Sequence, residues 1–559
     1  MSSEPTPSGT TTLYRGGFIR RVMGPVATVM VDACGGRHGW TGPEATAMVV
    51  AGGQIAWIGS DEEAASHVDG VGEVVELDGA LVTPTFVDAH VHTSQTGMGL
   101  RSVGLGEVNS VSEALAAIEA AARKRQGRPI YAPNWDEDDW LERRPPTGRE
   151  LDRAAYGGVV YSPRVDGHSA VISSALAGAS GARNLPGWND SGLVTREAHH
   201  AARDAFRDGV SPADRRADID TALNAAAAAG IGLLHENAGP HLSSAQDLAD
   251  VLAAGDRGDG PEVIGYWAEL VANKGQAEEL ARVRGVRGLA GDLNVDGSIG
   301  SHTASMRAPY SDVPDEGERA CGNAYLSVEQ VRDHVAACSL AGIQAGFHVI
   351  GDAGADTVVE GIQAAAAQVG AACVAHAGHR LEHLEMVGEG GIKALAKLKV
   401  TASVQPMFDA LWGGPHGMYA ARLGGDRANG MNRFGTMAAA GMTLAFGSDT
   451  PVTPFAPWQA IRAAAFHHEP SERISVAAAF QAHTYGGWRA AGIRDRGYLE
   501  VGQPASFAVW SVGGWGPQGS SYTPGDLGLP DLTPGETLPT NLRTVIRGRT
   551  VFVREGALS

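Results

Sequence analysis

Short apolar segments alternate with alanine-rich stretches between residues 81 and 449, and this alternation limits most strongly how the chain can fold. Apolar runs bounded by turn residues are typical of buried strands, whereas stretches such as LAAIEAAARKR and IKALAKL favour helix. One helical stretch begins with a capping box, Ser327 with Gln330, and ends at Gly342. Repeated strand and helix in this order predict a parallel sheet and hence an α/β fold.

Ten segments have the character of strands, whereas a (β/α)₈ barrel has eight strand positions. The second and third of them follow one another without a helix of barrel spacing, so we expect an insertion within about 128–215 that takes two strands from the count. The ten segments are 81–92, 129–135, 159–165, 230–236, 263–269, 288–295, 343–349, 379–383, 400–406 and 443–449.

The regions on either side of this alternation are typical of β structure. Before it, TAMVVAGGQIAWIGS places a Gly-Gly turn between two apolar runs, which predicts a hairpin. After about Leu499, GQPASFAVWSV and LRTVIRGRTVFVREG have the same hairpin character. Because the two flanks are alike, they could pair with each other.

The net charge of the 559-residue chain indicates which kinds of binding partner it does not favour. Its formal net charge of −19 argues against nucleic acid or an anionic membrane, since both are bound by clustered Lys and Arg. The first residues lack the basic start and apolar core of a secretory signal, and no apolar run is long enough to span a bilayer. We expect a small-molecule substrate, no nucleic-acid or membrane partner, a cytoplasmic location and, as an open possibility, a homo-oligomer. The four cysteines form no CxxC pair, so a thiolate zinc site is not indicated.

Four histidines and one aspartate stand where predicted strands end. His90 and His92 are two residues apart, which places both imidazoles on one face of a strand. His348, His383 and Asp449 close three later segments. A barrel carries its active site at the carboxyl ends of its strands, so the five side chains point to a metal site. The alternative for any one of them is a satisfied buried histidine or a capping aspartate.

These motifs resemble the amidohydrolase superfamily of metal-dependent hydrolases. The resemblance is carried by FVDAHVH, IGSD…VVELDGALVTP and GFHVIGD…HRLEH…GSDTPV. Four further segments resemble its amidohydrolase family 3 branch: NWDEDDWLERRPPTGRELDRA, PRVDGHSAVISSAL, NVDGSIGSHTASMRAPY and SVQPMF. The similarity runs from about residue 45 to the end of the chain.

The resemblance implies a distorted (β/α)₈ TIM barrel over 81–498, beside a composite β-sandwich built from 1–80 and 499–559. It also implies one or two divalent metals, with Asp449 as a ligand that doubles as general base. A histidine-rich set with a carboxylate and no thiolate favours zinc, Zn²⁺. The metal ligands that the resemblance implies are His90, His92, His348, His383 and Asp449.

The chain departs from the family pattern at Asp292. Family members usually carry there a lysine that, once carbamylated, bridges two metals, whereas the aspartate is much shorter. We therefore favour a single ion, with Asp292 as a tentative ligand. Glu236, which closes another strand segment, is a possible alternative carboxylate, although a hydrogen-bonding or surface role is equally open. Departures at Thr85, at His302 and in ASFAVW, which lacks the usual aspartate, do not touch the metal argument.

Three further residues match family positions near the pocket and are tentative substrate-binding candidates: Trp135, Asp136 and His168. The alternative for each is packing or turn chemistry. Glu385 could orient a ligand, although a solvated position is favoured. The pairs His199-His200 and His467-His468 are expected to face solvent.

The leading hypothesis is a metal-dependent hydrolase of carbon–nitrogen bonds other than peptide bonds, acting on an amide of a small molecule. One alternative is a deaminase or cyclic-amide hydrolase that uses the same ligands. Another is a catalytically silent barrel protein that binds without turnover after losing the bridging lysine. Retention of four histidines and Asp449 argues against the silent alternative.

Overall fold

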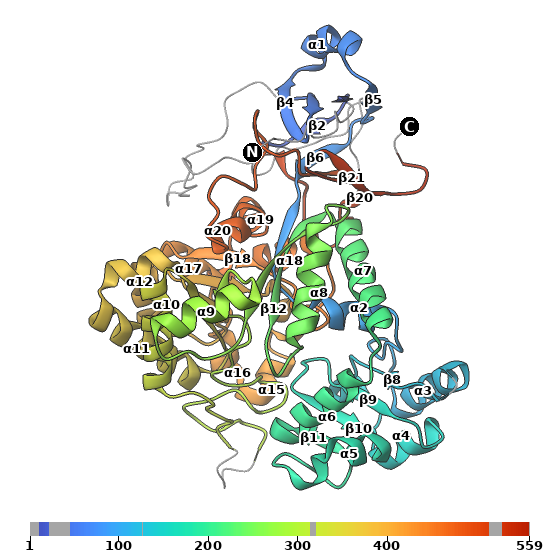
Figure 1. Cartoon of the computed structure of the whole chain (residues 1–559), viewed down its shortest axis with the longest axis vertical. Helices are drawn as coiled ribbons and strands as arrows, with labels where there is room; N and C mark the ends of the chain where they lie inside the picture. Colours follow the sequence, from blue (N-terminus) through green and yellow to red (C-terminus); the bar gives the residue numbers. More distant parts are fainter. Residues whose placement is uncertain (1–10, 22–44, 126, 314–319, 514–527, 558–559) are drawn as a thin grey trace.

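The computed structural model describes residues 11–21, 45–125, 127–313, 320–513 and 528–557. At its centre, eight parallel strands form a barrel surrounded by helices, which confirms the predicted fold class (Figure 1). Each barrel strand overlaps one of the ten predicted segments, and β12 and β13 extend slightly beyond theirs. In the order in which they are hydrogen-bonded, they are β7 (Phe86–Val91), β12 (Ile231–Ala238), β13 (Glu262–Trp267), β14 (Gly288–Leu289), β15 (Gln344–Val349), β16 (Arg380–His383), β17 (Thr401–Val404) and β18 (Thr443–Phe446).

The barrel strands are apolar because both of their faces are covered. Every residue of β7, β12 and β15 is buried, as expected for parallel strands between a barrel interior and a ring of helices. Past β18 the chain returns to β7, where the Asp449 amide donates to the His90 carbonyl at 2.8 Å. The His92 amide donates to the Thr450 carbonyl at 3.0 Å. These bonds close the barrel at the carboxyl end of β7.

Helices connect the strands and pack outside them. The predicted capping box of α10 is present, and Gly342 ends that helix with a φ of 68°. The helices are α2 (Thr93–Leu100), α7 (Pro212–Ala228), α8 (Ala245–Asp256), α9 (Lys274–Arg284), α10 (Val328–Ala341), α11 (Asp352–Val369), α12 (Ala371–Ala377), α13 (Glu389–Lys397), α14 (Pro406–Trp412), α15 (Met418–Leu423), α16 (Gly425–Asn429), α17 (Phe434–Ala439), α18 (Pro457–Ala465), α19 (Val476–Ala482) and α20 (Tyr485–Ala490).

A smaller lobe separates β7 from β12, in the part of the chain where we expected an insertion. Its sheet has the order β11-β10-β9-β8, and it gathers at the lower right of Figure 1, away from both chain ends. We call it the insertion. It comprises α3 (Val111–Arg125), β8 (Ile130–Tyr131), α4 (Gly148–Ala154), β9 (Val160–Pro163), β10 (Ser169–Ile172), α5 (Ser174–Ser180), β11 (Leu193–Thr195) and α6 (Arg196–Asp208).

Two further sheets lie outside the barrel: one is built only from strands that precede it, and the other joins strands from both sides of the barrel sequence. The predicted hairpin is β3-β4, and its turn glycines Gly52 and Gly53 have φ of 57° and 78°, which few other residues adopt. One sheet has the order β4-β3-β1-β5 and the other β2-β6-β19-β20-β21. The strands are β1 (Thr12–Arg15), β2 (Phe18–Ile19), β3 (Ala47–Ala51), β4 (Gln54–Gly59), β5 (Glu73–Glu76), β6 (Leu81–Pro84), β19 (Phe507–Ser511), β20 (Thr540–Ile546) and β21 (Arg549–Val553).

The predicted strand 81–92 is two strands in two different sheets. β6 pairs with β19 in the terminal sheet, and only from Phe86 does the chain run in the barrel. Trp510 explains part of this division, because its indole nitrogen donates to the Thr83 hydroxyl at 2.9 Å. The chain therefore crosses from the terminal sheet to the barrel at Thr85, a few residues later than the expected boundary at residue 80.

Among the described residues, no single helix has both the length and the apolar composition needed to cross a membrane. The pair α11 and α12, bent by 117° at their junction, meets that measure only when the two helices are taken together.

Candidate metal centre

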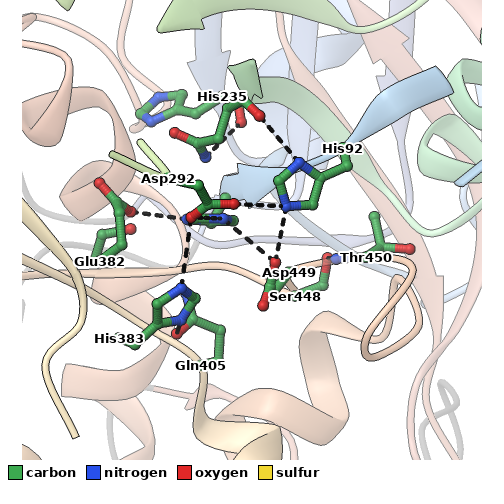
Figure 2. A network of polar contacts seen from close by, with 12 residues as sticks. His92, His235, Asp292, Glu382, His383, Gln405, Ser448, Asp449 and Thr450 are labelled. Atoms are coloured by element: carbon green, nitrogen blue, oxygen red, sulfur yellow. Dashed lines mark hydrogen bonds and ion pairs between the residues drawn. The ribbon is translucent and has the colours of Figure 1, made fainter. Parts of the chain in front are cut away.

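Six side chains from five strand ends converge at the carboxyl end of the barrel. Their exposed fractions lie between 0 and 10%, so the polar atoms face one another rather than water. In Figure 2, Asp292 lies between His92 and His383, with Asp449 beside His92. The cluster comprises His90, His92, Asp292, His348, His383 and Asp449, all of which the sequence had indicated.

The carboxylates of Asp292 and Asp449 contact the histidines at the Nε2 atoms of the imidazole rings. Asp292 Oδ1 lies 3.3 Å from His90 Nε2, and Asp292 Oδ2 lies 3.1 Å from His92 Nε2. Asp449 Oδ1 lies 3.3 Å from His90 Nε2 and 3.2 Å from His92 Nε2. His383 Nε2 is 3.7 Å from Asp292 Oδ1. The aspartate at position 292 is therefore long enough to reach three of the histidines.

The opposite nitrogen of three histidines is held by an acceptor. His90 Nδ1 lies 2.9 Å from Glu382 Oε2, and His92 Nδ1 lies 3.0 Å from the Asn237 carbonyl. His383 Nδ1 lies 2.8 Å from Gln405 Oε1. A carboxylate or carbonyl oxygen only accepts, so Nδ1 carries a proton, and Nε2 is the nitrogen through which each of these rings would bind an ion.

This donor set fits a divalent ion. His90 Nε2, Asp292 Oδ1 and His348 Nδ1 are buried without a hydrogen-bond partner among the described residues, a costly arrangement unless a cation satisfies such atoms. Two triads, His90-His383-Asp449 and His90-His92-Asp292, each keep their ligand atoms within 4.8 Å of one another. Ligands that surround zinc at about 2.0–2.1 Å stand roughly 3.0–3.4 Å apart, which matches the contacts of His90 and His92.

The electrostatics of the cluster also favour a cation. Burial opposes a charge on His92, but hydrogen bonds with Asp292 and Asp449 outweigh it and raise its pKa to about 10. The same two carboxylates overcome burial at His90 and raise its pKa well above the usual value. A site that draws protons onto two buried imidazoles is one in which a metal ion replaces those protons.

The backbone turns sharply where these side chains leave their strands. His383 and Asp449 have φ of 67° and 57°, in the left-handed region that non-glycine residues seldom adopt. Asp88 holds the turn before Asp449, because its Oδ1 accepts from the Ser448 amide at 2.8 Å and from the His90 amide at 3.3 Å. Strain of this kind is maintained at functional sites by the surrounding structure.

A buried ion pair that holds the His90 ring in place was not expected from the sequence. Arg380 and Glu382, both fully buried, form an ion pair with Nε–Oε1 at 2.6 Å. Burial raises the pKa of Glu382, but Arg380 and His90 outweigh it and hold that pKa far below its usual value. The charged Glu382 thus fixes the His90 ring. The i, i+2 spacing of Arg and Glu in HRLEH, on the face opposite Leu381, was the available signal.

A cavity of about 480 Å³ opens from the cluster toward the insertion. His92, Asp292, His383 and Asp449 line one end of it, and residues of α6 line the other. His168 lines it as well, and its ring centroid lies 5.3 Å from that of His348. Of the three predicted substrate-binding residues, His168 is the one that the structure brings to the cavity.

Trp135 and Asp136 do not line this cavity, so their prediction as pocket residues is corrected. Trp135 is 1% exposed in the core of the insertion, where its indole nitrogen donates to the Ser162 carbonyl at 2.9 Å. Asp136 accepts from Arg164 Nη2 at 2.6 Å, and that guanidinium lines the cavity. Asp136 therefore contacts a residue of the cavity wall without lining the cavity itself.

Glu236 is not brought to the cluster. It is buried on β12, and its Oε2 accepts from the Thr93 amide at 2.9 Å, where α2 begins. Burial raises the pKa of Glu236 to about 7. Of the roles left open by the sequence, the structure gives it that of a hydrogen-bond partner, which holds the turn after His92.

Three residues expected in solvent are buried. His199 and His467 are each 2% exposed, because packing of α6 on β9 and of the segment after α18 on α14 encloses them. Glu385 is also 2% exposed. Their local sequences are polar, and the elements that cover them lie far away in the chain.

A barrel that gathers histidines and carboxylates at the carboxyl ends of its strands has the architecture of metal-dependent hydrolases. The chain belongs to the amidohydrolase family, whose profile matches residues 73–552. This membership makes the protein a hydrolase of a metal-dependent superfamily.

The chain is similar over most of its length to proteins of a plant and a bacterium. It is 27% identical to Protein LONG AFTER FAR-RED 3 of Arabidopsis thaliana over 514 residues, 85% of each protein. It is 25% identical to N-substituted formamide deformylase of Arthrobacter pascens over 512 residues, 83% of this chain and 90% of that protein. The crystal structure of an uncharacterized metal-dependent hydrolase from Pyrococcus furiosus superposes with a TM-score of 0.67 at 23% identity, over 89% of this chain and 98% of that one, which supports the fold.

Proposed function

We propose that the protein hydrolyses an amide-type carbon–nitrogen bond, other than a peptide bond, in a small molecule. The observation that carries this proposal is the buried cluster of four histidines and two aspartates at one end of an open cavity. The family membership supports hydrolysis, and a relative named N-substituted formamide deformylase supports an amide substrate.

His90, His92 and Asp449 would hold the ion, with Asp292 as the fourth ligand. Their Nε2 and carboxylate oxygens already lie 3.1–3.3 Å apart around a common point. A divalent ion bound there supplies a lowered water pKa and polarises a carbonyl oxygen. The histidine-rich set without thiolates favours Zn²⁺ among such ions.

Asp449 is the proposed general base. It ends a barrel strand at the cavity, and its carboxylate is 10% exposed, so it can touch both water and substrate. It takes a proton from the attacking water and delivers that proton to the leaving nitrogen, so the carbon–nitrogen bond breaks with an amine as leaving group. Asp449 thus acts first as base and then as acid.

One ion per chain is favoured. The two possible triads share His90, and both carboxylates lie against His92, so their lone pairs converge on one position. A second ion beside His348 and His383 would have to share Asp292 or Asp449, the two carboxylates near His383. Two dications sharing so few negative charges repel strongly. Metal quantitation at saturation tests this count, and two equivalents per chain would contradict it.

Hydrolysis is tested by incubating zinc-reconstituted protein with a panel of N-formyl, N-acyl and cyclic amides and measuring released amine. Release from open-chain amides supports the proposal, whereas release of ammonia from ring carbons or opening of cyclic amides alone favours the alternative chemistry. Tight zinc binding without turnover on any member would favour the silent barrel. A cytoplasmic location and a homo-oligomeric state stay predictions of the sequence.

A further inference from the structure

The end of the cavity formed by the insertion has a charged group that nothing in the described chain balances. Helix α6 contributes Arg203 to the cavity wall, and its Nε is buried without a hydrogen-bond partner. Among the residues that the structure describes, the guanidinium of Arg203 forms no ion pair or hydrogen bond. A buried donor of this kind is costly unless a ligand uses it.

Five arginines line the cavity, and three of them have a carboxylate partner; among the described residues, Arg196 and Arg203 form no ion pair. Arg207 Nη2 lies 3.0 Å from Asp204, and Arg215 Nε lies 2.9 Å from Asp250. On the opposite wall, Arg164 is surrounded by four carboxylates, those of Asp136, Glu137, Asp138 and Asp166. Of the two without an ion pair, Arg203 is the one whose Nε is buried without a hydrogen-bond partner in the described structure.

The histidines beside Arg203 do not add charge and do not cancel it. Burial, together with the positive charge of Arg203, lowers the pKa of His200 to about 3. The same two causes hold the pKa of His199 well below its usual value. His199 Nε2 lies 2.8 Å from the Tyr161 hydroxyl, and His200 stacks on His241 with ring centroids 5.3 Å apart. His199 and His200 are therefore neutral beside the Arg203 guanidinium.

Acidic side chains that line this part of the cavity already have partners. Asp247 Oδ1 accepts from the Ser94 hydroxyl at 2.7 Å, and Asp218 accepts from Arg101 Nη1 at 2.5 Å. Glu269 accepts from the indole nitrogen of Trp267. Each of these carboxylates is directed to a partner of its own, so Arg203 has no internal counter-ion.

The cavity that Arg203 shares with the metal centre also has an apolar lining. Met98, Leu242, Leu270 and Phe206 line it, and Tyr161 stacks near Phe206 with centroids 5.3 Å apart. Such a wall excludes water, which strengthens the attraction between a guanidinium and an anion. It also suits a carbon chain that connects a reacting amide to a distant charged group.

We propose that Arg203 binds a carboxylate of the substrate, so that the preferred substrates are amides joined by an apolar spacer to a carboxylate. The inference rests on the proposed function, because the amide must lie at the barrel end of the same cavity. A carboxylate is the favoured anion since one planar guanidinium matches its two oxygens and its single charge, whereas a phosphate dianion would leave one charge unbalanced.

The test compares ω-formamido carboxylates of increasing chain length with the alcohols in which CH₂OH replaces the carboxylate. Binding is measured by calorimetry on metal-free protein, where hydrolysis does not intervene, and kcat/KM is measured on the zinc-loaded protein. The variants are Arg203→Met, which keeps the stem and removes the charge, and Arg203→Lys, which keeps the charge without the planar fork. Arg153→Met is the matched control, because Arg153 is exposed on α4 and does not line the cavity.

We expect wild-type protein to bind the best carboxylate at least 10-fold more tightly than its alcohol. Arg203→Met should weaken carboxylate binding by about 30-fold, as for the loss of a charged hydrogen bond, and Arg203→Lys by less. The loss of affinity that Arg203→Met causes for the alcohol should be at least 10 times smaller. Arg153→Met should bind both ligands as the wild type does. Equal loss on both ligands, equal binding of both by wild type, or tighter binding of the phosphonate analogue would overturn the proposal.

Failure of this inference is separable from failure of the proposed function. Carboxylate binding that depends on Arg203, without amide hydrolysis by the zinc-loaded protein, would uphold the binding site and contradict the proposed reaction. Hydrolysis of carboxylates and alcohols with equal kcat/KM, unchanged in Arg203→Met, would uphold the reaction and overturn the binding site.

Discussion

The two ends of the cavity are built in opposite ways. At the barrel end, His90, His92 and His383 each have an acceptor behind the ring and a carboxylate in front of it. At the insertion end, α6 presents Arg203 with no partner in the described chain and two neutral histidines beside it. The first end is fixed before any ligand arrives, and the second is completed by one.

This difference indicates that the barrel end carries out the reaction and that the insertion end selects the substrate. Catalytic groups must be held at fixed distances, because a misplaced group lowers the reaction rate. The strands of a closed barrel provide such rigid positions. Selection depends on which charge and length the far wall accepts, and a single helix of the insertion can change that wall without moving the barrel. The predictions below test this division, beginning with the change that should affect the barrel end most.

Removal of metal should abolish turnover while leaving the insertion end intact. Chelator-treated protein, shown to be metal-free by mass spectrometry, is expected to release no amine, and added zinc should restore the rate. Carboxylate binding that depends on Arg203 should persist in the metal-free protein. If the metal-free protein hydrolyses amides at the untreated rate, the barrel end is not a metal centre.

Asp449→Asn should lower kcat by about 10² or more with little change in KM for the same amide, because an amide side chain cannot accept the proton. Steady-state kinetics measure both constants, and metal content is determined on the same sample. Asp256→Asn, at the exposed end of α8, is the matched control and should behave as wild type. A near-normal kcat with full metal content would move the base to another residue.

Glu382→Gln should weaken metal binding by about 10- to 100-fold, as expected when the group that orients a ligating histidine is altered. Competition with a chelator of known affinity measures the effect, and thermal unfolding shows whether the barrel remains folded. Glu389→Gln, on the exposed face of α13, should leave the affinity unchanged. Unchanged affinity in folded Glu382→Gln protein would mean that the His90 ring needs no such support.

Trp135→Phe should have the smallest effect and should act on stability alone. The variant leaves the Ser162 carbonyl without its indole donor, at a cost of about 1–3 kcal/mol in the free energy of unfolding. Denaturant titration measures that loss, and the ratio of kcat/KM between carboxylates and alcohols should not move. A changed ratio at unchanged stability would return Trp135 to the substrate-binding wall.

Much of the barrel end could be predicted because its signals are local. A buried parallel strand is a short apolar run, and a histidine or aspartate at its end stands out, as at His348 and Asp449. The same reasoning set apart two of the four strands of the insertion, β8 and β9, from the eight barrel strands. The split of 81–92 at Thr85 was missed, since its cause, β19, lies at the other end of the sequence.

The insertion end could not be predicted, because what buries it is remote in sequence. REAHHAARDAFRD is the sequence of a polar helix, and only its packing against Tyr161 of β9 encloses His199. For the same reason Trp135, beside a run of acids, resembled a pocket residue and is a core residue. Asp292 was only a tentative ligand in the sequence, because chain length does not give the position of its backbone, which brings the carboxylate to three histidines.

The pairing of β6 with β19 also means that β6 is synthesised long before the strand it pairs with. Thr83 and the Trp510 that binds it are 427 residues apart, and at about 5–20 residues per second a ribosome needs roughly 20 to 85 s to make that interval. Trp510 also packs on Phe86 and Trp458, with ring centroids 5.5 Å away from each. Throughout that time β6 lacks its β19 partner and Phe86 lacks the cover of Trp510, and an unpaired strand edge beside exposed apolar surface is prone to wrong association.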